Sequence, residues 1–164
     1  MSETQRDSAA APRRQKFLVV VDDTAESRVA LRYATRRARN IHCGVVLLRV
    51  VEPVDFNQWA GVAEIMRQEA YEGAESLLRQ LAEQVNLESG LLPEVSIREG
   101  KAKDEVLKLV EEDPGIRMLV LAAAPGNEPG PLVTALAGQM VGNLSFPITL
   151  VPGTLTDEQI DRIT

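Results

Sequence analysis

The sequence predicts a doubly wound α/β fold in which five parallel strands alternate with four helices. The run 17–21 holds five successive apolar residues, mostly β-branched, which is typical of a strand buried on both faces of a parallel sheet. A helical periodicity occurs between successive apolar runs. This pattern is expected of a parallel sheet, because each pair of parallel strands needs a crossover connection, usually a helix. An apolar content of 45% over 164 residues suffices for one domain with its own core.

Two strands and two helices are expected in the first half of the chain: strand 16–22, helix 26–40, strand 44–51 and, after a loop at 54–60, helix 62–85. The long helix is expected to bury one stripe of residues at steps of three and four, namely Val62, Met66, Ala70, Ala74, Leu77, Leu81 and Val85. In the first helix, the five arginines between positions 28 and 39 are expected to form a solvated face.

The second half is expected to add strand 94–98, helix 104–112, strand 116–123, helix 131–144 and strand 147–151. A Gly/Pro-rich loop at 125–130 precedes the fourth helix. That helix carries one stripe with the 3.6-residue period, made of Leu132, Val133, Leu136, Ala137, Met140, Val141 and Leu144. Thr156, with Gln159 three residues later, indicates a capping box and a short terminal helix.

The chain is expected to divide into a flexible tail at 1–15, an α/β domain at 16–153 and a short helical extension at 154–164. The tail lacks the apolar stretch of a secretory signal, so we expect a cytoplasmic protein. A net charge of −6 argues against nucleic acid as a partner, and the lack of a run of 18 apolar residues argues against a membrane span. The lone Cys43 excludes an intramolecular disulfide and a cysteine-based metal site, and no metal site is expected.

A candidate site lies where the first strand ends, because ligands of open α/β sheets bind at the carboxyl ends of the strands. Asp22 and Thr24 follow that strand directly. Asp22 has two equally weighted interpretations, a ligand contact and a cap of the following helix, and Asp23 or Thr24 is an alternative cap. Adjacent side chains on a strand point to opposite faces, so Asp22 and Asp23 make a poor acid–base pair. No catalytic constellation is found, and the sequence therefore predicts a protein that is not an enzyme.

Several segments together resemble the universal stress protein family. They are residues 21–27 (VDDTAES), 47–53 (LLRVVEP), Glu99-Gly100 with the helical stretch 105–110, residues 119–121 before the Gly-rich loop, and residues 146–152 (FPITLVP). The resemblance covers about residues 16–153 and depends on the order and spacing of these segments. It implies a five-stranded parallel sheet in the order 3-2-1-4-5 with helices on both faces, and a cytoplasmic dimer.

One branch of that family binds ATP through a Gly-x2-Gly-x9-Gly-Ser/Thr loop after the fourth strand, where glycines let the backbone approach phosphates. The match here is poor, because Ala123 stands in place of the first glycine and Pro125 lacks an N–H. Gly126 is the one clearly retained glycine. An ungapped alignment places Thr134-Ala135 at the end of the motif, whereas a shifted alignment places Gly138-Gln139 there, and either one damages the phosphate site.

The resemblance gives a set of candidate nucleotide-binding residues: Asp22, Thr24, Val50, Gly126, Gly130 and Thr134. Each also has an ordinary structural interpretation. Val50 is expected either to pack on adenine or simply to be a buried strand residue. Gly126 and Gly130 are expected either to cradle phosphate or to serve a turn. No cofactor is required on this view, and ATP or AMP is the cofactor that the resemblance allows.

The leading functional hypothesis is a non-enzymatic regulatory or adaptor protein of stress response, which acts on an unknown protein client as a homodimer formed through residues 147–151. The alternative within the family is an ATP- or AMP-binding protein. A receiver-like signalling domain is a third hypothesis, but it needs an Asp after the third strand and a Lys after the fifth. Arg98-Glu99 and Pro152-Gly153 occupy those positions, so this hypothesis is disfavoured.

Overall fold

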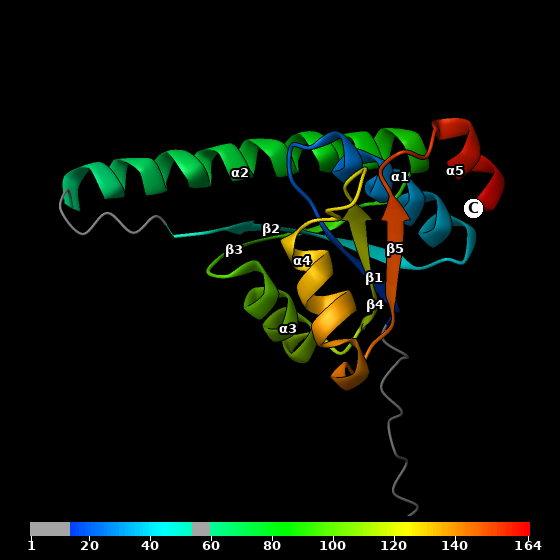
Figure 1. Cartoon of the computed structure of the whole chain (residues 1–164). Helices are drawn as coiled ribbons and strands as arrows, with labels where there is room; N and C mark the ends of the chain where they lie inside the picture. Colours follow the sequence, from blue (N-terminus) through cyan, green and yellow to red (C-terminus); the bar gives the residue numbers. More distant parts are fainter. Residues whose placement is uncertain (1–13, 54–59) are drawn as a thin grey trace, which may run out of the picture.

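Five parallel strands form one sheet in the order β3-β2-β1-β4-β5 (Figure 1). The computed structural model describes residues 14–53 and 60–164, and its strands are β1 (Lys16–Val20), β2 (Gly44–Val51), β3 (Glu94–Glu99), β4 (Ile116–Ala123) and β5 (Ile148–Pro152). Val19 lies at the centre of the sheet, in register with Leu47 on one side and Val120 on the other. The predicted fold class, strand order and adjacency of β1 and β4 are therefore confirmed.

Helices cover both faces of the sheet because each face carries its own apolar cluster. On one face, Val19 and Leu47 pack with α1 (Ala25–Asn40) and α2 (Ala60–Ser89). On the other, Leu18 and Leu48 pack with α3 (Ala102–Glu112) and with the segment that begins at α4 (Pro131–Val133). Alternate residues of β1 and β2 thus serve opposite clusters, which explains why their apolar runs are continuous.

The fourth helix is less regular than predicted. After the single turn of α4, the chain continues as a π-helix at Thr134–Gln139 and a 3-10 turn at Val141–Asn143. The N–H of Met140 reaches back five residues to the carbonyl of Ala135, over 3.1 Å. Gly138 and Gly142 lower the helical propensity of this segment, so packing of Val133 and Leu136 in the core decides its shape.

Helix α2 is longer than predicted, and only its second half is packed. Ala74, Leu81 and Val85 are buried as expected, but Val62 is 48% exposed and Met66 38% exposed. Thirty helical residues span about 45 Å, whereas the eight residues of β2 span about 26 Å. The helix therefore projects past the sheet at its N-terminal end, as Figure 1 shows. The predicted loop 54–60 lies outside the described residues except for Ala60, which begins α2.

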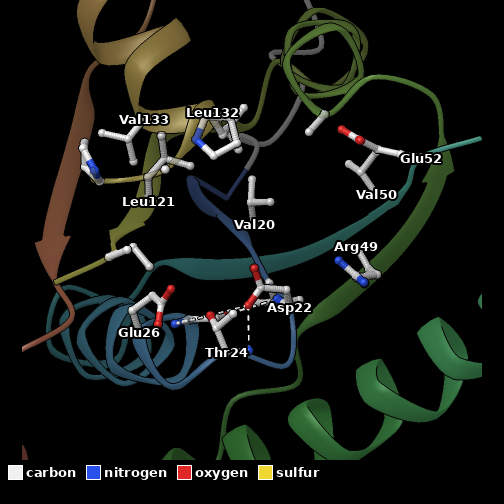
Figure 2. A pocket seen from close by; sticks show the side chains of 18 of the residues that line it. Val20, Asp22, Thr24, Glu26, Arg49, Val50, Glu52, Leu121, Leu132 and Val133 are labelled. Atoms are coloured by element: carbon white, nitrogen blue, oxygen red, sulfur yellow. Dashed lines mark hydrogen bonds between the residues drawn. The ribbon is translucent and has the colours of Figure 1, made fainter. Parts of the chain in front are cut away.

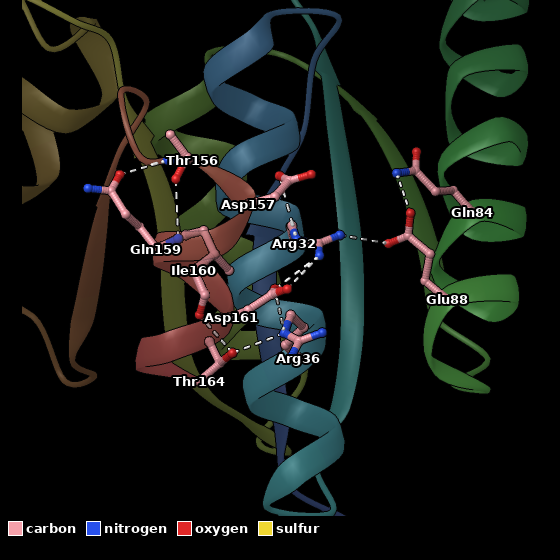
Figure 3. Close-up of polar contacts among 10 residues, drawn as sticks. All are labelled: Arg32, Arg36, Gln84, Glu88, Thr156, Asp157, Gln159, Ile160, Asp161 and Thr164. Atoms are coloured by element: carbon pink, nitrogen blue, oxygen red, sulfur yellow. Dashed lines mark hydrogen bonds and ion pairs between the residues drawn. The ribbon is translucent and has the colours of Figure 1, made fainter.

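The short terminal helix α5 (Asp157–Ile163) is fastened to α1 by both apolar and charged contacts (Figure 3). Thr156 and Gln159 form the predicted capping box, and Ile160 is fully buried in the core. Arg32 and Arg36 contact the carboxylate of Asp161 at 2.9 and 3.0 Å. The expectation of a wholly solvated arginine face on α1 is therefore wrong for these two residues, which a distant segment of the chain covers.

Among the described residues, no helix is long and apolar enough to cross a membrane. The predicted tail at 1–15 falls outside the described part of the chain except for residues 14 and 15.

Candidate functional site

A cavity of about 620 Å³ opens at the carboxyl ends of β1, β2 and β4, and is called here the carboxyl-edge pocket (Figure 2). This is the side of the sheet on which ligands of doubly wound folds bind. Its apolar wall comes from the strand residues Val20, Val50 and Leu121 together with Leu132 and Val133 of the fourth-helix segment. Its polar rim comes from the loop after β1, the first turn of α1 and the end of β2.

Asp22 and Thr24 shape the rim through a network at the start of α1. Thr24 is the N-cap of α1, and its hydroxyl accepts a hydrogen bond from the Ser27 N–H at 3.3 Å. Asp22 Oδ1 in turn accepts hydrogen bonds from the Thr24 N–H at 2.8 Å and from the Thr24 hydroxyl at 2.5 Å. Of the two interpretations of Asp22, direct helix capping is thus excluded, because Thr24 is the cap and Asp22 orients it. Asp22 Oδ2 makes no hydrogen bond within the described residues.

The loop between β4 and α4 is closed on itself. The Ala124 N–H donates to the Pro129 carbonyl at 3.1 Å, and Gly126 and Gly130 adopt φ angles of 94° and 111°. Gly130 lines the pocket, whereas Gly126 does not. Both glycines are required by the positive φ of the turn, which is the structural interpretation given to them from the sequence.

Thr134 and Gly138, the two alternative ends of the family's phosphate motif, both lie outside the pocket. The Thr134 hydroxyl donates to the Gly130 carbonyl at 3.0 Å and is exposed. Gly138 is also exposed, within the π-helix. The pocket therefore brings together four of the six candidate residues, namely Asp22, Thr24, Val50 and Gly130, and leaves out Gly126 and Thr134.

Three charged residues of the pocket were missed from the sequence: Glu26, Arg49 and Glu52. None of them forms an ion pair or a side-chain hydrogen bond with another described residue. Figure 2 shows Glu26 on the α1 side of the pocket, and Arg49 and Glu52 on the opposite side. A signal for two of them was present, since Arg49 interrupts the apolar run of β2 near its carboxyl end and Glu52 directly follows that strand.

A second cavity, of about 420 Å³, lies at the amino ends of the strands and is lined by charged side chains that form ion pairs with one another. Lys16 Nζ contacts the carboxylates of Asp113 at 2.5 Å and Glu94 at 2.8 Å. Burial lowers the pKa of Lys16, but the hydrogen bonds to Asp113 and Glu94 outweigh it, so the pKa lies above its ordinary value. Within residues 14–53 and 60–164, no group of three or more His, Cys, Asp or Glu side chains is arranged to hold a metal ion.

The family model of the Universal stress protein family matches residues 13–152 of this chain. No curated protein sequence matches it. Among solved structures, universal stress protein UspA from Lactobacillus plantarum is similar with a TM-score of 0.70 and 20% identity, over 85% of this chain and 98% of that one.

Two further solved structures have the same fold. A universal stress protein family member from Burkholderia pseudomallei gives a TM-score of 0.68 at 16% identity, over 87% of this chain and 99% of that one. An Arabidopsis thaliana universal stress protein family protein, solved with AMP bound, gives 0.58 at 16% identity, over 88% of this chain and 94% of that one. At identities this low, the structural similarity shows a shared fold and nothing more.

Proposed function

This chain belongs to the universal stress protein family, and we propose that it is a non-enzymatic, dimeric regulatory protein of the cytoplasm that acts in stress response through a protein client. The observation that supports the non-enzymatic part of this proposal is the composition of the carboxyl-edge pocket. It has an apolar wall and a rim of hydrogen-bond acceptors, but the only cation among its lining residues that the structure describes is Arg49. Enzymes that transfer phosphoryl groups need several positive or N–H groups around the phosphates.

Adenine nucleotide binding is the second candidate function, supported by the AMP in the similar Arabidopsis protein. Against tight binding, Pro125, Pro129 and Pro131 remove three N–H donors from the loop region, and Thr134 spends its hydroxyl on the Gly130 carbonyl. We therefore expect ATP to bind no tighter than a dissociation constant of about 0.1 mM, which corresponds to about −5.5 kcal/mol.

Dimer formation is proposed through β5, which lies at one edge of the sheet. Leu150 is 43% exposed there, so the strand presents apolar surface as well as unpaired backbone groups. The Leu119 N–H donates to the Pro147 carbonyl, and the Gly153 N–H donates to that of Ala123. Pro147 and Gly153 thus direct their backbone groups toward β4, and the direction alternates from residue to residue along a strand. The N–H of Thr149 therefore points toward β4, and the N–H groups of Ile148 and Leu150 point to the open edge.

The register decides how the dimer is tested. Replacing Thr149 with Pro would break the β4 ladder, whereas Leu150→Pro removes a donor from the open edge. We expect Leu150→Pro to sediment as a folded monomer and Leu150→Thr, which keeps the N–H, to remain dimeric. A folded Leu150→Pro protein that stays dimeric would place the interface elsewhere.

Thermal-shift measurements with ATP and AMP test whether the protein binds adenine nucleotides. A ligand that binds only the native state raises the melting temperature according to its occupancy. At 0.1 mM ATP we expect a stabilisation of at most about 0.4 kcal/mol, because occupancy reaches no more than half. A large shift at low micromolar ATP would favour the nucleotide-binding function over the proposed one.

A further inference from the structure

We propose that Glu26 determines which ligand enters the carboxyl-edge pocket, by rejecting phosphate groups and leaving an uncharged purine nucleoside as the preferred ligand. This inference rests on the proposed function, because it concerns the same pocket and the same weak ATP binding. It goes further in naming one residue as the cause, and in predicting a ligand that lacks phosphate.

The position of Glu26 is fixed by close packing against Gly153, which directly follows β5. A Cβ atom on Gly153 would clash with Glu26 Cβ and would lie 3.0 Å from the Ala123 carbonyl oxygen. The Gly153 N–H donates to that same carbonyl at 2.8 Å. Because Gly153 has no side chain, its backbone packs directly against Cα and Cβ of Glu26 in the first turn of α1. From there its side chain lines the pocket (Figure 2).

The charge of Glu26 is not neutralised by any neighbour that the structure describes. It forms no ion pair, and Arg49 lies across the pocket from it in Figure 2. Glu26 also lies in the first turn of α1, where its carboxylate interacts favourably with the positive end of the helix dipole. A bound phosphate would gain less from that dipole, because the carboxylate already offsets it. Within that turn, the Ser27 N–H already donates to the Thr24 hydroxyl. A phosphate in this pocket would meet the carboxylates of Asp22, Glu26 and Glu52, with Arg49 as the one cation among the described lining residues.

An uncharged nucleoside complements this pocket in shape and in hydrogen bonding. The flat base fits an apolar wall such as that formed by Val20, Val50 and Leu121. The ribose hydroxyls and an exocyclic amine are donors, and carboxylates such as Asp22 Oδ2 and Glu26 are acceptors. Hydrogen bonds to charged acceptors are the stronger kind. The rim thus offers carboxylate acceptors to the hydrogen-bond donors of an uncharged nucleoside.

Calorimetric titration of the full chain with adenosine and with AMP tests this inference, using Glu26→Gln and the matched control Glu158→Gln. Glu158 is also a first-turn glutamate, on α5, exposed and outside the pocket. For the unaltered protein we expect adenosine to bind at least tenfold more tightly than AMP. Glu26→Gln should strengthen AMP binding about tenfold, the scale of one charge–charge repulsion at a partly buried site. It should weaken adenosine binding, because the amide oxygen still accepts a hydrogen bond but no longer carries a charge. Glu158→Gln should change neither.

A measurement on the unaltered protein keeps the test independent of how the variant folds. The preference for adenosine over AMP should shrink as ionic strength rises from 0.02 to 0.5 M, on the order of several-fold, because salt screens the repulsion. Equal or tighter binding of AMP, an unchanged ratio in folded Glu26→Gln, or binding of neither ligand would each overturn the inference. None of these results bears on the β5 dimer, which is tested separately by Leu150→Pro.

Discussion

The two cavities at opposite ends of the sheet carry charge in opposite ways. At the amino end, Lys16 sits between Asp113 and Glu94, and its ammonium contacts both carboxylates. At the carboxyl end, Glu26 and Glu52 line a larger cavity and contact no cation among the described residues. The cavity at the amino end is therefore lined by ion pairs, and the carboxyl-edge pocket holds carboxylates with no ion pair among the described residues.

Backbone geometry accounts for this difference. At the amino end the chain is drawn tightly around Lys16, because its N–H donates to the Gly115 carbonyl and the Gly44 N–H donates to the Gln15 carbonyl. A Cβ atom on Gly115 would lie 2.9 Å from the Lys16 side chain. The carboxyl end instead meets loops and the start of α1, which leave space between them. Paired charges thus mark the cavity at the amino end, and unpaired charges mark the pocket that we propose as the ligand site.

The largest effect should come from breaking the paired end. Lys16→Met keeps the length of the side chain but leaves Asp113 and Glu94 without their shared cation, so we expect a loss of about 1–2 kcal/mol in the free energy of unfolding. Urea denaturation measures this loss. Lys101→Met, at an exposed lysine with no ion pair among the described residues, is the control and should change stability by less than about 0.5 kcal/mol. Equal losses in the two variants would contradict the assigned role of Lys16.

High pH should remove the same contribution without a mutation. The pKa of Lys16 is raised in the folded protein, so the stabilisation is fully present below the unfolded value of 10.5 and is lost as pH rises through the folded value. The difference in stability between the unaltered protein and Lys16→Met should therefore be constant at neutral pH and shrink above about pH 10.5. A difference that grows in that range would show that the sign is wrong.

At the rim of the carboxyl-edge pocket, we expect stability to depend on the hydrogen bonds that join Asp22, Thr24 and Ser27. Thr24→Ala removes the N-cap of α1 and one of the two donors to Asp22 Oδ1, so we expect a loss of about 1 kcal/mol. Thr154→Ala, at an exposed threonine without a side-chain hydrogen bond to any described residue, serves as the control in thermal unfolding. A Thr24→Ala protein as stable as the control would mean that the cap contributes nothing.

The smallest effect on stability is expected at Glu26. Glu26→Gln breaks no ion pair with the described residues and loses only the interaction with the α1 dipole, so the free energy of unfolding should fall by no more than about 0.5 kcal/mol. Chemical denaturation alongside Lys16→Met makes the comparison direct. A loss above about 1 kcal/mol would assign Glu26 a structural role and remove the contrast between the two ends.

The sequence was sufficient to predict the sheet, because continuous apolar runs and helical crossovers depend on local patterns. It was less informative where long-range packing decides the outcome. The periodic stripe of α2 includes Val62 and Met66, but the sheet ends before it reaches them, so periodicity overstated burial. The π-helix at Thr134–Gln139 follows from packing on the sheet and has no signature in the stripe that predicted a regular helix.

The candidate site was predicted in part for the same reason. Asp22 and Thr24 lie in the short loop after β1, and Val50 is the last residue but one of β2, so the rule for the carboxyl ends of strands finds them. Glu26 was missed, since its place in the pocket depends on Gly153, which lies far along the chain and packs against its stem. Arg32 was also misread, because α5 covers it from the other end of the sequence.

The central claim is that the carboxyl-edge pocket is the ligand site of this protein. The most direct test is a titration of ¹⁵N-labelled protein with adenosine, followed by amide chemical shifts. We expect the largest changes at Val20, Val50 and Gly130, which line the pocket, and unchanged signals at Gly44 and Gly115 of the amino end. Changes confined to the amino end, or no changes at millimolar adenosine, would contradict the claim.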